Sequence, residues 1–289
     1  MKVVVAGGTG FLGSALAASL RLDGHHVLVM TRHPKTHDEV PWTDPSVLDG
    51  ADAVVNLSGE PLDAGRWTEA RKASILESRI KSTETLVKGM SSVTRRPAVF
   101  LNASAVGVYG THGPEALTEE SPPGSGFLAS VCVRWEAAAM AAAWMTRVVL
   151  LRTGLPLDKT SGALPKLALP FRLFAGGRVG SGDQYWSWIH LDDWTRLVRW
   201  AIDSPEIKGP INLTAPSPVT NREFTAALAH ALHRPAIAPA PAFALRLLLG
   251  EMADAVILSG QRVLPATAMR NGFEFRYPDL QSALRQIYQ

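Results

Sequence analysis

The first half of the chain alternates short apolar runs with longer amphipathic segments. The apolar runs are rich in β-branched residues and predict buried strands at residues 3–6, 27–30, 53–57, 98–101 and 148–151. The amphipathic segments carry apolar residues at helical spacing and predict helices at residues 11–22, 67–90 and 127–144. Such an alternation is typical of a parallel sheet with helices on both faces.

The pattern changes after Arg152, where prolines recur and several glycines follow between residues 176 and 182. A helix at 192–202 and a strand at 211–213 predict a return to the sheet. Beyond them the sequence predicts short helices separated by proline turns. One of these begins with a capping box, Thr220 with Glu223, and continues to Leu232. The long polar stretch 111–126 is of a length typical of a lid or a disordered segment.

Composition narrows the class of protein. Hydrophobic residues make up 46% of the 289 residues and charged residues 19%, which excludes a disordered chain. The net charge is only +3 and the one basic pair is Arg95–Arg96, so we expect no nucleic-acid partner. A single cysteine, Cys132, excludes an internal disulfide, and no spacing of acidic or histidine residues indicates a metal site.

No apolar stretch is long enough to cross a membrane, and the N-terminal apolar run is too short for a signal peptide. We therefore expect a cytoplasmic protein that acts on a small-molecule substrate and has no membrane partner.

Glycines at 7, 10 and 13 lie where the first predicted strand gives way to the first helix. In a dinucleotide-binding loop the first glycine makes the tight turn. The second lets a pyrophosphate approach the backbone, and the third lets the helix pack against the strand. The phosphates then lie at the positive N-terminal end of the helix. The alternative is a turn with a purely structural role.

The end of the second predicted strand indicates which dinucleotide is bound. An NAD site usually has an acidic residue there for the ribose hydroxyls, whereas this chain has Thr31-Arg32-His33. The guanidinium of Arg32 can pair with a 2′-phosphate, which favours NADP(H), although a solvated surface arginine is the alternative. Arg79 lies on the core-facing arc of its helix. It is either an arginine with a buried stem or a ligand of the cofactor phosphate or ribose.

Several further stretches carry a resemblance to a known family. They are Asn56-Leu57-Ser58-Gly59-Glu60, Glu77-Ser78-Arg79, the run 104–110 (SAVGVYG), Leu151-Arg152-Thr153-Gly154, the run 184–190 (QYWSWIH), and residues 214–221 and 260–265. With the glycine loop, they make the chain similar to the extended short-chain dehydrogenase/reductase superfamily. Within it, the chain resembles the atypical "epimerase family" group of sugar-nucleotide epimerase-like oxidoreductases. The match spans nearly the whole sequence.

The resemblance and the glycine loop together predict the fold and the cofactor contacts. The expected fold is α/β, a Rossmann-like doubly wound parallel sheet with a small, mostly helical C-terminal substrate lobe. Residues 1–155 and 183–215 would form the NADP-binding domain, and residues 156–182 and 216–289 the substrate lobe. The predicted cofactor-binding residues are Gly7, Thr9, Gly10, Phe11, Leu12, Thr31, Arg32, Leu57, Ser58, Gly59, Arg79 and Leu155.

The usual proton-transfer residues of this superfamily are missing. Ordinary members use a Tyr and a Lys four residues later on one helix, and the Lys lowers the pKa of the Tyr. In this chain the two positions align with Leu128 and Cys132, and the usual Ser/Thr near them is Ala105. The candidate replacements are Tyr109, which follows the end of a predicted strand, and Ser104, which lies beside Ala105. The alternative for Tyr109 is a residue that only packs in the core. Cys132 is interpreted as a small buried hydrophobe.

The predicted substrate residues are cationic, aromatic or titratable. They are Arg178, Trp186, Trp188 and His190, in a wider set with Lys166, Arg172 and Gln184. The alternative is that the polar residues lie on ordinary helix faces and the tryptophans pack in the core. Asp192 and Asp193 are expected to cap the helix that follows His190.

Three hypotheses for function remain at this stage. The first is an NADP-dependent oxidoreductase or epimerase acting on a small polar substrate, which includes anionic and nucleotide-linked molecules. The second is a non-catalytic NADPH-binding sensor, suggested by the missing dyad. A third, weaker hypothesis is a protein that has kept only the fold.

Overall fold

The computed structural model describes residues 1–289. Seven parallel strands form the central sheet in the order β11-β7-β5-β4-β1-β2-β3. Their bounds are β1 Lys2–Ala6, β2 His26–Thr31, β3 Glu39–Pro41, β4 Ala53–Asn56, β5 Val99–Ala105, β7 Arg147–Thr153 and β11 Gly209–Leu213. The five predicted strands and the predicted return strand are all confirmed. The order reverses between β1 and β4, which makes this the switch point of a doubly wound sheet.

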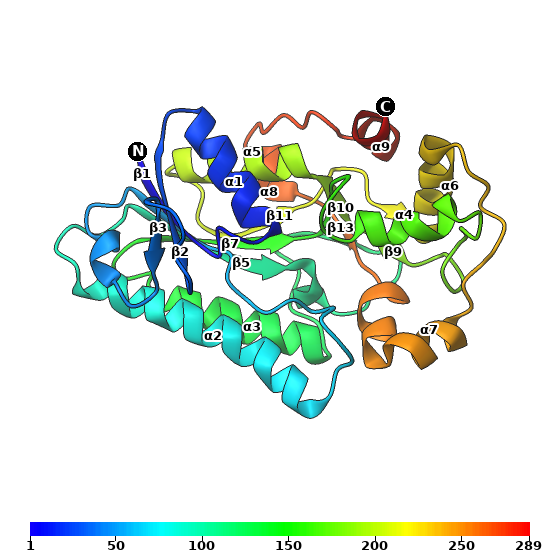
Figure 1. The fold of residues 1–289 in the computed structure, drawn as a ribbon, viewed down its shortest axis with the longest axis horizontal. Coiled ribbons are helices and arrows are strands. Elements are labelled where there is room, and N and C mark those ends of the chain that lie inside the picture. Colours follow the sequence, from blue (N-terminus) through cyan, green and yellow to red (C-terminus); the bar gives the residue numbers. More distant parts are fainter.

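Helices cover both faces of the sheet (Figure 1). On one face lie α1 (Phe11–Leu22), α5 (Leu191–Asp203) and the short α8 (Ala266–Arg270); on the other lie α2 (Glu69–Ser92) and α3 (Phe127–Met140). Alternate residues of β1 serve the two sides: Val3 and Val5 belong to the core under α1 and α5, and Val4 to the core under α2 and α3. The strand is apolar throughout because both of its faces are buried.

The second half of the chain adds a smaller lobe at the carboxyl ends of the strands (Figure 1). Its helices are α4 (Leu164–Arg172), α6 (Asn221–Leu232), α7 (Ala242–Leu249) and α9 (Leu280–Tyr288), with a π-helical turn at Ala253–Ile257. Short strands accompany it, namely β8 Leu155–Leu157, β9 Tyr185–Trp186, β10 Trp188–His190 and β12 Val219–Thr220. β9 and β10 fall within the segment 183–215 expected in the NADP-binding domain, and the predicted bounds of the two domains stay a prediction. The lobe has its own apolar core, built around Trp186, Trp188, Phe224 and Leu284. The Thr220–Glu223 capping box that begins α6 is confirmed.

The stretch 111–126 is not a free lid, and this expectation is wrong. Its strand β6 (Ala116–Leu117) pairs with β13 (Arg262–Val263). The buried carboxylate of Glu119 accepts hydrogen bonds from the backbone N–H groups of Asn212 (2.9 Å) and Thr267 (3.2 Å). A buried acceptor that lost both of these hydrogen bonds would be costly, so this loop is fixed to the body of the molecule.

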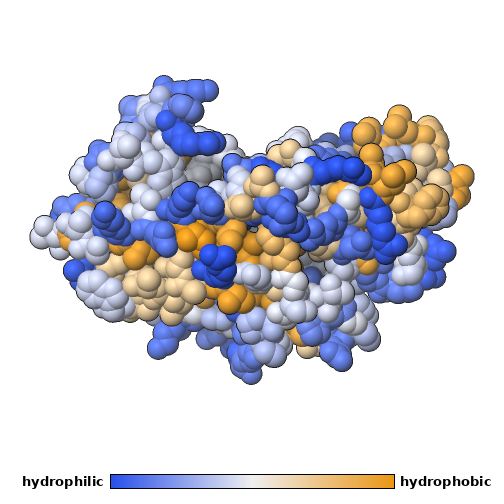
Figure 2. All heavy atoms as spheres, turned by 90° about the horizontal axis from the view of Figure 1, so that it is seen from below, coloured by the Kyte–Doolittle hydropathy of each residue, from blue (hydrophilic) through white to orange (hydrophobic).

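The surface seen from the α2 and α3 side has two hydrophobic areas (Figure 2). The exposed apolar side chains of α3 are Val133 and Met140, followed by Trp144, and those of α7 are Phe243, Leu247 and Leu248. No helix is both long and apolar enough to span a lipid bilayer.

Candidate functional site

The glycine loop follows β1 at the switch point of the sheet. Gly7 has a φ of +79°, and a Cβ there would lie 2.8 Å from the backbone carbon of Leu57 in the loop after β4. A Cβ on Gly13 would lie 2.3 Å from the carbonyl oxygen of Gly7. Both positions therefore require glycine for reasons internal to the protein, one for the turn and one for close helix–strand packing.

Gly10 differs from these two glycines. It is the N-cap of α1, with φ −82° and ψ 174°, a conformation open to any residue, and an added Cβ would meet only the carbonyl oxygen of Gly7 at an ordinary 3.4 Å. No side chain caps α1, so the N–H groups of its first turn have no side-chain acceptor. This exposed backbone at a helix N-terminus is a favourable place for an anion.

A polar pocket of about 550 Å³ lies against this turn. Its lining from the Rossmann part of the chain is Thr9, Gly10, Phe11, Ser14 and Asp63, and its lining from the C-terminal lobe is Thr160, Ser161, Gly162, Pro165 and Lys166. The pocket is thus an open one, lined by two parts of the chain that are far apart in sequence, one of which carries the glycine loop.

The loop after β4 borders the glycine loop. Its Ser58 has a buried hydroxyl with no hydrogen-bond partner in the protein, an arrangement that is unusual unless a ligand or water supplies the partner. The backbone N–H of Ser58 is fixed by the side chain of Asn56 (3.1 Å), which in turn donates to Asn102 and Thr83 (2.7 and 3.0 Å). A buried polar network therefore sets the position of this loop beside Gly7.

Arg32 lies directly after β2 and is exposed. Its side chain makes no hydrogen bond or ion pair with the protein, while Thr31 before it ends the strand. All the N–H groups of its guanidinium are therefore available for a ligand.

Arg79 is held on α2 beside Gly59. Its Nη1 donates to the carbonyl oxygens of Ile75 (2.9 Å) and Glu60 (3.1 Å), and its guanidinium lies 5.1 Å from the ring centroid of Trp135. Burial lowers the pKa of Arg79 from its ordinary value. The remaining N–H groups of this cation have no protein partner, so both the buried-stem and the ligand interpretations keep support.

The helix that carries the dyad in ordinary relatives is α3. Leu128 lies in its first turn, and Cys132 is buried one turn later. Burial is the main cause that raises the pKa of the Cys132 thiol to about 11, so the thiol is neutral at physiological pH. Leu128 has no titratable group, and Cys132 is buried and neutral, so the two residues do not reproduce the Tyr–Lys dyad. The interpretation of Cys132 as a buried hydrophobe agrees with this position.

Tyr109 and Ser104 belong to a buried polar network. The Tyr109 hydroxyl donates to Asn212 (2.8 Å) and accepts from Arg152 (2.9 Å), and its side chain is completely buried. Burial raises the pKa of Tyr109. Ser104 donates to Glu136 (2.6 Å), and Glu136 accepts two hydrogen bonds from Arg152, each 2.9 Å. The two candidate proton carriers are thus connected by the Arg152–Glu136 ion pair, with their hydroxyls already bonded inside the protein.

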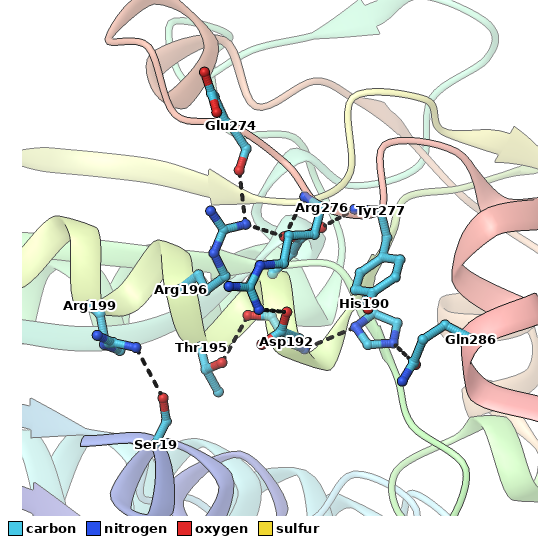
Figure 3. Close-up of polar contacts among 11 residues, drawn as sticks. Ser19, His190, Asp192, Thr195, Arg196, Arg199, Glu274, Arg276, Tyr277 and Gln286 are labelled. Carbon is cyan, nitrogen blue, oxygen red and sulfur yellow. Dashed lines mark hydrogen bonds and ion pairs between the residues drawn. The ribbon is translucent and has the colours of Figure 1, made fainter. Parts of the chain in front are cut away.

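His190 is the N-cap of α5 (Figure 3). Its Nδ1 accepts from the backbone N–H of Asp192 (3.1 Å), its Nε2 bonds Gln286 (2.8 Å), and its ring lies 4.0 Å from that of Tyr277. The expectation that Asp192 and Asp193 cap this helix is wrong. The carboxylate of Asp193 instead accepts from the backbone N–H groups of Arg276 and Tyr277, because it is buried facing that segment.

The other predicted substrate residues are spread over the lobe. Trp188 is buried and donates to the carbonyl oxygen of Ser217 (3.0 Å); Trp186 packs edge-on against Phe224. Both rings are therefore part of the core of the lobe. Arg178 is exposed and bonds the carbonyl oxygen of Ser181 in its own loop. Leu155 is half-buried in β8, which pairs with the strand that ends in His190.

Sequence reasoning missed two features of this region. Asp63 and Ser14 line the pocket without belonging to any motif, and Glu119, Asn212 and Glu136 form the buried network only because distant segments meet. No local spacing in the sequence indicates either feature.

The switch-point glycine loop and the sheet order define a Rossmann-type dinucleotide-binding protein. Residues 3–213 match the NAD dependent epimerase/dehydratase family, and residues 240–287 match a domain of unknown function. The chain therefore belongs to the NAD-dependent epimerase/dehydratase family, as its resemblance to the extended short-chain dehydrogenases/reductases predicted.

Similar proteins come from bacteria, plants and animals. An epimerase family protein of Mycobacterium leprae is 41% identical, over 98% of this chain and 94% of that protein. An Arabidopsis thaliana relative, named as chloroplastic, is 42% identical over 100% of this chain and 87% of its own length. The cytoplasmic location stays a prediction.

Two solved structures support the same assignment. The human epimerase family protein SDR39U1, crystallised with NADPH, has a TM-score of 0.93 and 34% identity, over 100% of this chain and 99% of that one. A nucleoside-diphosphate sugar epimerase from Corynebacterium glutamicum has a TM-score of 0.82 and 36% identity, over 100% of this chain and 58% of that one.

Proposed function

We propose that this protein binds NADP(H), with the pyrophosphate at the N-terminus of α1 and the 2′-phosphate at Arg32. The observation that carries the proposal is Gly10. The surrounding protein leaves room for a side chain at this position, yet the residue is glycine. It lies at the N-terminus of α1, which no side chain caps. A pyrophosphate that approaches the backbone supplies the missing reason. The human relative crystallised with NADPH supports the same assignment.

The preference for NADP(H) over NAD(H) rests on Arg32. A free guanidinium at the end of β2 pairs with the 2′-phosphate through charge-assisted hydrogen bonds. NAD-binding relatives of this fold place an acidic residue there to bind the ribose hydroxyls. The unpartnered, exposed state of Arg32 supports this choice.

We further propose that the protein is an oxidoreductase or epimerase for a small polar substrate, nucleotide-linked or otherwise anionic. The bound cofactor would give or accept hydride at its nicotinamide ring. The chain's own residues bind and orient the two molecules. Tyr109 and Ser104 stay the candidate proton carriers, each hydrogen-bonded to a member of the Arg152–Glu136 pair. The proton of the reaction is exchanged by one of these hydroxyls or by water.

The second candidate function is NADPH binding without turnover. It is favoured by one specific observation, the apolar Leu128 and neutral, buried Cys132 in place of the dyad. The two candidates are separated by following NADPH absorbance in a metabolite extract and with a panel of carbonyl compounds. Protein-dependent oxidation of NADPH, or conversion of a compound to its epimer without net oxidation of the cofactor, supports the enzyme. Tight binding with neither reaction supports the sensor.

Replacement of Arg32 tests the cofactor assignment. Arg32→Asp should weaken NADPH binding by about 1.5–3 kcal/mol, tenfold or more, because a charge-assisted pair is lost. NADH binding should be spared. Binding titrations with both cofactors measure the two effects. Lys208→Asp is the matched control, because it makes the same charge change on an exposed loop before β11, at the opposite edge of the sheet. Equal loss of NADPH and NADH binding would contradict the assignment.

A further inference from the structure

The pocket at the glycine loop carries one cation and one anion of its own. Lys166 lies in the first turn of α4, and Asp63 lies in the loop between β4 and α2. Both line the pocket and they form an ion pair with each other, so the pair joins the C-terminal lobe to the Rossmann part of the chain. The lysine is 69% exposed and the aspartate 51% exposed.

Two helix N-termini meet at this pocket. Besides Phe11 of α1, its lining includes Pro165 and Lys166 at the start of α4, and neither helix has a side-chain cap. Each uncapped start contributes partial positive charge and free N–H groups, although α4 supplies fewer of these groups because Pro165 has no N–H. The Asp63 carboxylate is the anion that faces this field, and its hydrogen bond with Lys166 lowers its pKa below the ordinary value.

An exposed ion pair of this kind contributes only about 0–1 kcal/mol, so little free energy is lost when it separates. A pyrophosphate at the start of α1 carries at least two negative charges close to Asp63. The lysine gains more from such a ligand than from one carboxylate, whereas Asp63 repels it. The same pocket thus holds one residue that favours the ligand and one that opposes it.

We propose that Lys166 is a cofactor-binding residue that leaves Asp63 and pairs with the pyrophosphate when the cofactor binds. This proposal rests on the proposed NADP(H) function and adds to it a residue of the C-terminal lobe. Asp63 is the counter-ion that holds Lys166 over the pocket in the free protein. Cofactor binding thereby replaces the ion pair between Lys166 and Asp63 with one between Lys166 and the pyrophosphate.

The proposal predicts opposite effects for the two members of the pair. Lys166→Gln should weaken NADPH binding about tenfold, through loss of a charge-assisted contact. Asp63→Asn should strengthen it about threefold, because the competitor for Lys166 and the nearby negative charge are both removed. If the ion pair only joined the two parts of the chain, both substitutions would change the NADPH affinity in the same direction, because each of them removes the pair.

The test is a calorimetric titration of the full-length protein and its variants with NADPH at low and high salt. Lys159→Gln is the control, because Lys159 is an exposed lysine on the same segment that does not line the pocket. Lys166→Arg should keep most of the affinity. Thermal unfolding of each variant checks that the fold is retained, which is expected because these side chains are exposed.

Opposite signs for Lys166→Gln and Asp63→Asn, with no effect of Lys159→Gln, support the proposal. Equal signs, or a Lys166→Gln effect no larger than that of Lys159→Gln, overturn it while wild-type NADPH binding still supports the proposed function. Failure of the wild-type protein to bind NADPH overturns both.

Discussion

Replacement of Gly10 by alanine should weaken cofactor binding while leaving the stability of the protein nearly unchanged. The backbone at Gly10 has a φ of −82°, and the new methyl group would meet only the carbonyl oxygen of Gly7 at 3.4 Å. The fold should therefore accept alanine, with a change in unfolding free energy within about 1 kcal/mol for an altered N-cap. A phosphate oxygen that bonds a backbone N–H lies about 2.9 Å from the nitrogen, which leaves no room for a methyl group between them.

The expected cost to cofactor binding follows from this conflict. The pyrophosphate must withdraw and lose at least one charge-assisted hydrogen bond, about 1.5–3 kcal/mol, which weakens NADPH binding roughly 10- to 150-fold. The assays are calorimetric titration with NADPH and thermal unfolding of the cofactor-free protein.

Gly13→Ala is the contrasting variant. Its methyl group would lie 2.3 Å from the Gly7 carbonyl oxygen and 2.7 Å from the Gly8 Cα, so it should destabilise the protein even without cofactor. If Gly10→Ala binds NADPH as tightly as the wild-type protein, the position assigned to the pyrophosphate is wrong.

Two further predictions concern buried titratable groups. Cys132, with its pKa raised to about 11, should resist alkylation by iodoacetamide at pH 8 in the native protein and react once the protein is unfolded; rapid labelling of the native protein would contradict its burial. Burial lowers the pKa of His190 from 6.5, so the folded protein binds its proton less readily than the unfolded chain does. The free energy of unfolding should therefore fall as the pH drops below about 6.5, and this dependence should be weaker in His190→Asn, which keeps a side-chain acceptor for the helix cap. Denaturant unfolding between pH 5 and 8 measures the difference, and equal slopes for the two proteins would exclude His190 as its cause.

The central sheet could be predicted because its strands are buried on both faces and leave long apolar runs. Val3 to Ala6 and Val148 to Leu151 are recognisable for this reason. β3 could not be recognised, since it is a three-residue edge strand that begins with Glu39 and ends with a proline. The loop at 111–126 was misinterpreted because its order depends on Glu119, whose partners lie about 90 and 150 residues further along the chain.

The cofactor site was more predictable than the rest of the functional region. The glycine loop is a local pattern in which Gly7 and Gly13 are required by close backbone contacts, and Arg32 is the residue directly after the second strand. The role of His190 as a helix cap depends instead on Gln286 and Tyr277, which only the folded chain brings near it. The Asp63–Lys166 pair likewise joins a loop and the start of α4, which no periodicity in the sequence connects.

The most direct test of the account is a calorimetric titration of the purified wild-type protein with NADPH and, separately, with NADH. The account predicts saturable binding of one NADPH per chain, at least tenfold tighter than NADH, because Arg32 pairs only with the 2′-phosphate. No detectable heat with NADPH, or equal affinity for the two cofactors, would contradict it.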